Sequence, residues 1–289
     1  KQSMRLKFPD EFVATTGVYE PVVAIKEADL MFVGYGIVAP EYGWDDYKGV
    51  DVTGKVLLMM NDDPNTGDST FFAGKGRTYY GRWTYKYEIA ARKGAVGVII
   101  IHTTGSAGYP YQVVQTSRSR ENFDLDVPGK RLDMKLKGWT TEESTRRYLS
   151  MAGFNLDTLL AGAQKKSFIP LQLGLKVSTR MQYAVRRLQT HNVIGLLRGS
   201  DALMSQEYVV FSSHHDHLGI GAPILGDSIY NGALDNASGV SMILGIAEEF
   251  SAMKIKPKRS LLFAAVAAEE KNLLGSQYFA EHPTVSGGS

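Results

Sequence analysis

Short apolar runs separated by Gly, Pro and Asp residues dominate the first part of this chain. Examples are LMFVGYGIV at 30–38 and KVLLMMN at 55–61, which predict strands joined by tight turns. Residues 85–95 carry apolar side chains at helical spacing and end at Gly94, and the run VGVIIIH at 96–102 predicts a buried strand. The pattern therefore indicates a β-rich region that contains one helix–strand unit.

The middle of the chain is less regular. Residues 103–140 contain Gly and Pro clusters and predict a long loop. Residues 140–153 begin with Thr followed by acidic residues, which predicts a capped helix. Residues 171–188 alternate apolar and polar side chains, as one or two antiparallel strands do.

From His191 the pattern changes to strands that alternate with helices. Strands are predicted at 192–199, 207–214 and 259–267, and helices at 239–253 and 272–282. Such alternation indicates a mostly parallel sheet. We place a domain boundary near 186–190.

Composition narrows the function classes. The 289 residues are 44% hydrophobic and 21% charged, which is typical of a soluble globular protein. The net charge of +2 argues against nucleic acid or a membrane surface as a partner. No apolar run reaches the roughly 18–20 residues that span a bilayer, and Lys1–Pro9 lacks the apolar core of a signal peptide. Without cysteine, only His, Asp and Glu remain as plausible catalytic metal ligands.

A His-x-Asp motif, His214 to Asp216, follows the predicted strand YVVFSS. Ligands of open α/β sheets bind outside the carboxyl ends of the strands. A metal-bound imidazole commonly donates its other N–H to a carboxylate, and Asp216 has the chemistry for that position. Spacing alone does not decide which histidine of the HHDH segment at 214–217 is the ligand, and solvated histidines at a polar strand end are the alternative.

Asp235 lies in the segment GALDNASG, directly before a predicted helix. Asn236 or Ser238 can cap that helix. The helix N-terminus places partial positive charge near the Asp235 carboxylate. Taken alone, an ordinary capping aspartate explains this segment as well as a metal ligand does.

Two adjacent carboxylates, Glu269 and Glu270, follow the apolar run LLFAAVAA. Ionised carboxylates at the end of a buried strand are costly unless they are paired, protonated or bound to a metal. One of the pair can ligate a metal, while the other acts as general base on an activated water. The alternative is a solvent-exposed helix start with acidic residues in its first turn.

In their order along the chain, the three motifs resemble the co-catalytic zinc aminopeptidase family. This family includes bacterial leucyl-type aminopeptidases, glutamate carboxypeptidase and the non-catalytic transferrin receptor. The resemblance covers roughly residues 190–282. The segments GYGIVAPEYGWDDYKG, KVLLMMNDDP and YKYEIAARKGAVGVIIIH are similar to the protease-associated (PA) domain inserted in many members.

The resemblance implies a fold class and a domain order. The fold class is α/β, with a partial mixed, mostly parallel peptidase sheet flanked by helices and a β-rich α+β PA insert domain. Residues 1–20 are a residual peptidase segment or linker, residues 21–187 the PA domain, and residues 188–289 the N-terminal part of the zinc peptidase domain. The insert would shape or cover the substrate cleft.

The resemblance also implies a role for each site residue. His214 binds one zinc ion, with Asp216 behind it orienting the ring. Asp235 bridges two zinc ions, Glu270 binds the second, and Glu269 is the general base that moves a proton from a zinc-activated water to the leaving amine. The implied function is a metallopeptidase that removes N-terminal amino acids from peptides.

The chain departs from the family pattern after the glutamate pair. Each zinc ion needs one further ligand there, an Asp and a His, but Glu281 and His282 lie about 18 Å further along a helix and cannot close the same site. We therefore expect a truncated chain with an incomplete two-zinc site, inactive alone and completed by missing peptidase segments. A smaller departure is Asn272, where the family usually has Gly.

Two other functions remain open. One is a non-catalytic, receptor-like binding protein of the same fold, in which the metal-binding residues would be replaced by other residue types. The other is a zinc carboxypeptidase or a glutaminyl cyclase, which the missing downstream residues would distinguish. Since members with this insert are often exported, the resemblance implies a periplasmic or secreted protein.

Overall fold

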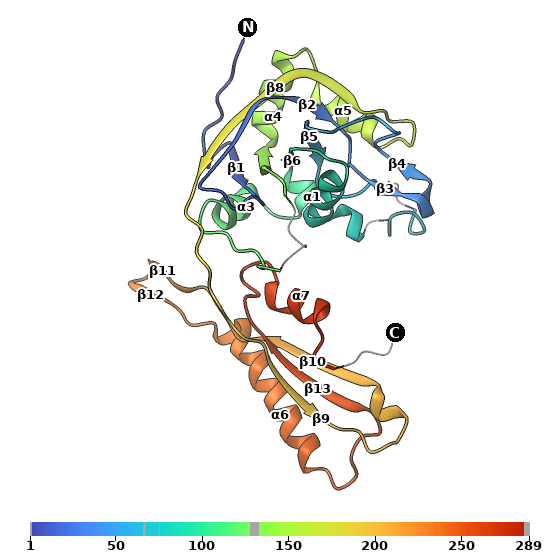
Figure 1. Cartoon of the computed structure of the whole chain (residues 1–289), viewed down its shortest axis with the longest axis vertical. Helices are drawn as coiled ribbons and strands as arrows, with labels where there is room; N and C mark the ends of the chain where they lie inside the picture. The colour runs from blue at the N-terminus through green and yellow to red at the C-terminus, as the bar shows by residue number, and fades with distance from the viewer. Residues whose placement is uncertain (1, 66–67, 75, 128–132, 286–289) are drawn as a thin grey trace. The chain divides into compact units, whose positions relative to one another are not determined.

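The computed structural model describes residues 2–65, 68–74, 76–127 and 133–285. They form two compact units, here called unit 1 (Lys1–Asn122 with Val127–Arg186) and unit 2 (Phe123–Asp126 with Arg187–Ser289), which Figure 1 shows in colours that follow the chain. In the described part of the chain, every helix is too short or too polar to cross a membrane.

Unit 1 is built on a six-stranded mixed sheet with the order β1-β7-β6-β5-β2-β8. The four strands β7, β6, β5 and β2 are parallel to one another, and β1 and β8 pair antiparallel at the two edges. The strands are β1 (Phe12–Thr15), β2 (Val22–Phe32), β5 (Val56–Met60), β6 (Gly97–His102), β7 (Leu136–Thr141) and β8 (Leu171–Gln182), with β3 (Val38–Ala39) and β4 (Trp44–Asp45) as a separate short pair.

Helices complete unit 1, and their ends follow local sequence signals. The Thr141 hydroxyl accepts a hydrogen bond from the Ser144 N–H and so caps α4, whose first turn is acidic. Gly94 follows α1 with a left-handed φ of 78°. The helices of unit 1 are α1 (Trp83–Arg92), α2 (Thr104–Ala107), α3 (Tyr111–Arg118), α4 (Glu142–Met151) and α5 (Leu156–Ala163), with short 3-10 turns at Pro40–Tyr42 and Tyr79–Gly81.

The core of unit 1 lies around its central parallel strands. All five residues of β5 are buried, which explains why its sequence is continuously apolar. The prediction of one long loop over 103–140 is wrong, because α2, α3 and β7 lie within it. β7 was missed because its sequence, LKGWTT, mixes polar residues and Gly into a strand that is buried by tertiary packing.

Unit 2 contains a three-stranded sheet with the order β10-β13-β9. β10 and β13 are parallel, from Tyr208 opposite Ser260 to His214 opposite Val266, and β9 pairs antiparallel with β13. A β-hairpin and a long helix connect the parallel strands, as parallel pairing requires a crossover. The elements are β9 (Val193–Leu197), a 3-10 turn (Met204–Gln206), β10 (Tyr208–His214), β11 (Gly219–Ile224), β12 (Asp227–Tyr230), a kinked turn (Ala233–Ala237), α6 (Ser238–Ala252), β13 (Ser260–Val266) and α7 (Leu274–Glu281).

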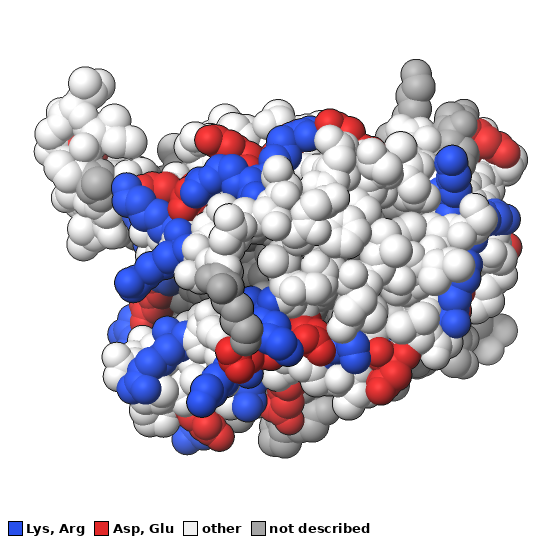
Figure 2. Space-filling view, turned by 90° about the horizontal axis from the view of Figure 1, so that it is seen from above, with Lys and Arg blue, Asp and Glu red and all other residues white. Residues whose placement is uncertain are grey.

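The fold class predicted from the sequence is confirmed. Unit 2 is α/β with a mixed sheet packed by α6 and α7, and unit 1 is a β-rich α+β fold. On the face drawn in Figure 2, Lys and Arg side chains lie beside Asp and Glu side chains, in keeping with a net charge of +2. This face therefore carries both signs of charge.

Candidate metal centre

The parallel pairing of β10 with β13 brings two of the predicted motifs together. His214, the last residue of β10, lies opposite Val266, the last residue of β13. The His215 N–H continues the ladder by donating to the Val266 carbonyl at 3.0 Å. Since both strands end at the same edge, the histidines that follow β10 meet the segment Ala268–Leu273 that follows β13, here called the acidic loop.

Asp235 reaches the same edge from the kinked turn before α6. The Asn236 Oδ1 accepts a hydrogen bond from the Gly239 N–H at 3.0 Å, so Asn236 caps the first turn of that helix. The Asp235 side chain is 68% exposed, and its Oδ1 lies 2.9 Å from the His214 Nε2. The Asp235 carboxylate therefore contacts His214 and still has room to bind a metal ion.

Three side chains of unit 2 form a group that could hold a metal ion. Ligand atoms of His217, Asp235 and Glu270 lie within 4.8 Å of one another, and in the described part of the chain no other group of three His, Asp or Glu does so. The His217 Nδ1 lies 2.8 Å from the Glu270 Oε1. One imidazole and two carboxylates are a donor set that fits Zn²⁺.

The structure brings both candidate histidines close to Asp235. His214, predicted from the resemblance to bind zinc, touches Asp235 and lies 3.8 Å from the Glu269 Oε2. His217, which the sequence did not single out, belongs to the group with Glu270. Strand alternation would have grouped His217 with His215, but β10 ends at His214 and the chain turns there. The one available signal was the density of histidines in the HHDH segment.

Asp216 makes different contacts from those expected of it. The His214 Nδ1 lies 3.0 Å from the Asp216 main-chain carbonyl and 3.8 Å from its carboxylate. The carboxylate instead accepts the N–H of Glu269 at 3.0 Å and the N–H of Glu270 at 3.2 Å. Asp216 therefore fixes the main chain of both glutamates, and its carbonyl contacts the imidazole.

The electrostatics of the centre follow from burial and close charges. Burial raises the pKa of the Glu269 carboxyl, and the His214 imidazole opposes this shift while the neighbouring carboxylates add to it. Burial lowers the pKa of His214, but the contact with the Asp216 carbonyl and the charges of Glu269 and Asp216 outweigh it, so the pKa is raised. The Glu269 carboxyl and the His214 imidazole thus each shift the pKa of the other.

Backbone geometry explains the departure at Asn272. Its φ is 74°, in the left-handed region that Gly adopts without cost. Asn is among the residues that tolerate this region best. The change from the family's usual Gly to Asn therefore preserves the conformation of the acidic loop.

Removing the Asp216 carboxylate should weaken metal binding and stability together. Asp216→Ala leaves the N–H groups of Glu269 and Glu270 without their acceptors, at a cost of about 1–3 kcal/mol of unfolding free energy. We expect zinc affinity to fall about 10–100-fold, as for residues that support metal ligands. Zinc competition with a chromophoric chelator and urea denaturation measure the two effects. Unchanged zinc affinity in a folded variant would contradict this assignment.

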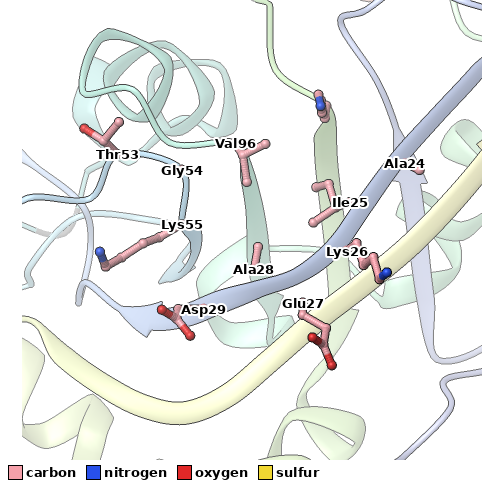
Figure 3. Close-up of a pocket in the computed structure, with 11 residues that line it drawn as sticks. Ala24, Ile25, Lys26, Glu27, Ala28, Asp29, Thr53, Gly54, Lys55 and Val96 are labelled. Atoms are coloured by element: carbon pink, nitrogen blue, oxygen red, sulfur yellow. The ribbon is translucent and has the colours of Figure 1, made fainter.

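Unit 1 contains a hollow of different character. It has a volume of about 420 Å³ and is lined by residues 24–29 of β2, by the turn at 53–55, and by Val96 and Lys135, as Figure 3 shows for most of them. Its charged side chains include Lys55 and Asp29, and Asp29 pairs with Lys176. The described residues around it form no group of metal ligands, so the candidate site is the one in unit 2.

Comparisons with known proteins agree with this division. Residues 192–287 match the model of peptidase family M28, and residues 18–128 match that of the PA domain. Aminopeptidase NAALADL1 of Mus musculus is 30% identical over 124 residues, which are 42% of this chain and 15% of the mouse protein. A probable zinc metalloprotease of Pyrenophora teres f. teres (strain 0-1) is 36% identical over 89 residues, 31% of this chain and 18% of the fungal protein.

Solved structures with a similar chain path include BSAP, a zinc aminopeptidase from Bacillus subtilis. It is 18% identical with a TM-score of 0.36, over 95% of this chain and 52% of the solved chain. This chain thus spans less than a fifth of the two curated relatives named above and about half of that structure.

The sequence matches agree with the three motifs found along the chain. The match to peptidase family M28 spans all three motifs, and the match to the PA domain lies in the N-terminal part of the chain. The resemblance inferred from the three motifs is confirmed.

Proposed function

We propose that the full-length protein is an aminopeptidase that uses two zinc ions and Glu269 as general base. One observation carries this proposal: the Asp235 carboxylate is close to two sets of candidate ligands. It contacts His214, and it also belongs to the group with His217 and Glu270. A carboxylate shared in this way is suited to bridge two metal ions.

The residues would divide the chemistry among them. Zinc bound there would polarise the scissile carbonyl and activate water at neutral pH. His214 with Asp235 would hold one ion, and Asp235 with Glu270 the other. His217 would either join Glu270 as a ligand or orient its carboxylate through the 2.8 Å contact.

Glu269 is the proposed proton carrier. Its side chain is about a third exposed, at 34%, and its Oε2 lies 3.8 Å from the His214 Nε2, so it lies beside the candidate ligands without belonging to the group of three. In that position it would accept a proton from the attacking water and deliver it to the leaving amine. Its pKa, raised by burial, suits a group that must both take up and release a proton.

The choice of an aminopeptidase over a carboxypeptidase or cyclase is supported by the relative named aminopeptidase NAALADL1. We further propose that additional peptidase segments pack on unit 2 and supply the remaining ligands. In support, Val210 of the edge strand β10 is 50% exposed, and Leu196 of β9 is 43% exposed. Apolar residues at such positions favour cover by further chain.

Chelation provides the direct test of the proposed function. The full-length protein should release nitroaniline from aminoacyl-nitroanilides, lose this activity with a chelator, and regain it when zinc is added back. N-terminally blocked substrates should not be cleaved, which separates an aminopeptidase from the alternatives. Turnover that is insensitive to the chelator, or cleavage that requires a free carboxyl terminus, would overturn the proposal.

A further inference from the structure

The acidic loop has a main-chain conformation that needs outside support. Three residues without the freedom of Gly have left-handed φ angles in it: Ala268 at 54°, Asn272 at 74° and Leu273 at 62°. Such conformations cost on the order of 1–3 kcal/mol each and persist where the surroundings hold them. The contacts that hold this loop therefore decide where Glu269 and Glu270 point.

One support is Asp216, described above, and the other is the side chain of Asn192. The Asn192 Oδ1 accepts the Ala267 N–H at 2.9 Å, directly before the loop. The Asn192 Nδ2 donates to the Gly275 carbonyl at 2.8 Å, two residues after the loop. One amide therefore bridges both ends of the segment that carries the two glutamates.

The position of Asn192 follows from the sheet. The β9–β13 ladder ends with Val193 opposite Ala265, and Asn192 precedes β9 by one residue. The Ala267 N–H, two residues beyond Ala265, therefore has no main-chain partner on β9. The Asn192 side chain takes the place of that partner. It accepts a hydrogen bond from a partly buried N–H that would otherwise have no acceptor.

Gly275 also links the two ends of the acidic loop. Its N–H donates to the Ala267 carbonyl at 3.0 Å. A Cβ at position 275 would lie 2.0 Å from that carbonyl oxygen and 2.7 Å from the Asn192 Oδ1. Only Gly permits the two ends of the loop to approach this closely, and the approach is what allows one amide to reach both.

We propose that Asn192 is a positioning residue for the metallopeptidase reaction: by bridging Ala267 and Gly275 it fixes the acidic loop, and so the directions of Glu269 and Glu270. This inference rests on the proposed function. Asn192 contacts neither of the two glutamates among its hydrogen bonds, so it acts through the main chain. A displacement of about 1 Å at reacting groups can cost about 100-fold in rate.

The chain offers a matched control at the other end of the same strand. Ser260, the first residue of β13, is buried and bridges two main-chain groups, accepting the Gly199 N–H at 3.0 Å and donating to the Ser205 carbonyl at 2.7 Å. Ser260→Ala therefore removes a similar bridge from β13 without touching the acidic loop. This variant shows how the loss of a buried hydrogen-bonded bridge away from the acidic loop affects stability, zinc affinity and kcat.

The test compares Asn192→Ala, Asn192→Asp and Ser260→Ala in the full-length protein. Asn192→Ala should lower zinc affinity and kcat each by about 10–100-fold, with KM changed less than kcat. Asn192→Asp has the same shape and keeps the acceptor for Ala267, but it turns an oxygen toward the Gly275 carbonyl, so it should also lose affinity and rate. Ser260→Ala should lower the Tm while zinc affinity and kcat stay within about twofold of wild type.

Zinc competition with a chromophoric chelator supplies a readout that does not depend on turnover. If wild type binds zinc but cleaves no aminoacyl-nitroanilide, the proposed aminopeptidase function fails, and the role of Asn192 is still judged by affinity. Equal zinc affinities in Asn192→Ala, Ser260→Ala and wild type would overturn the positioning role. An Asn192→Asp variant with wild-type affinity would do the same, because it would show that only the shape of the side chain matters.

Discussion

Replacing Glu269 with Gln should reduce kcat by about 10²–10⁴-fold while zinc remains bound. The substitution keeps the size and polarity of the side chain but removes its ability to accept a proton. Glu269 lies beside the candidate ligands but is not part of the group formed by His217, Asp235 and Glu270, so metal binding should change little. Steady-state hydrolysis of an aminoacyl-nitroanilide and zinc analysis of the same preparation measure the two effects.

Glu249→Gln is the matched control for Glu269→Gln. Glu249 lies exposed on α6 and undergoes the same chemical change away from the centre. It should leave both kcat and zinc content at the wild-type level. A Glu269→Gln protein that retains full turnover would exclude Glu269 as the base and would direct attention to Glu270.

Replacing Asp235 with Asn should have the largest effect on metal binding. Asp235 contacts His214 and also belongs to the group with His217 and Glu270, so its loss weakens both proposed zinc positions. We expect zinc affinity to fall by more than about 100-fold, because supporting residues alone are worth about 10–100-fold. Its side chain is 68% exposed, so the unfolding free energy should change little. Isothermal titration with zinc gives affinity and stoichiometry together.

Asp227→Asn, on β12, makes the same change of charge outside the metal centre. The Asp227 Oδ1 accepts the Ile229 N–H at 2.8 Å, a contact that Asn can keep. This variant should bind zinc as wild type does. If Asp235→Asn keeps the wild-type stoichiometry and affinity, Asp235 does not bridge the ions, and the two-zinc proposal loses its main support.

The sequence predicted the structure best where candidate metal-binding side chains follow an apolar strand. The runs before His214 and before Glu269 predicted buried strands, and these strands pair in parallel with their ends together. The α/β pattern after His191 and the helices at 85–95 and 140–153 also agree with the structure. These features are local: each depends on periodicity or on a capping residue within a few positions.

The features that the sequence did not predict depend on contacts between residues far apart in the chain. β7 pairs with β1 and β6, and its short sequence of mixed polarity shows no strand period by itself. The part played by Asp216 could not be read from the two-residue spacing to His214, because its carboxylate binds N–H groups more than fifty positions away. The same holds for His217, which meets Glu270 only because β10 ends at His214.

The sequence by itself indicated the family and the residue types of the candidate metal centre, because strand ends, helix caps and motif order are local features of the chain. The tertiary structure alone decided how those residues are arranged. It brought Asp235 close to both His214 and His217, turned the Asp216 carboxylate toward the main chain of the glutamates, and linked the two ends of the acidic loop through Asn192. Each of these contacts requires β9, β10 and β13 to lie side by side, and side-chain spacing within one segment cannot specify that.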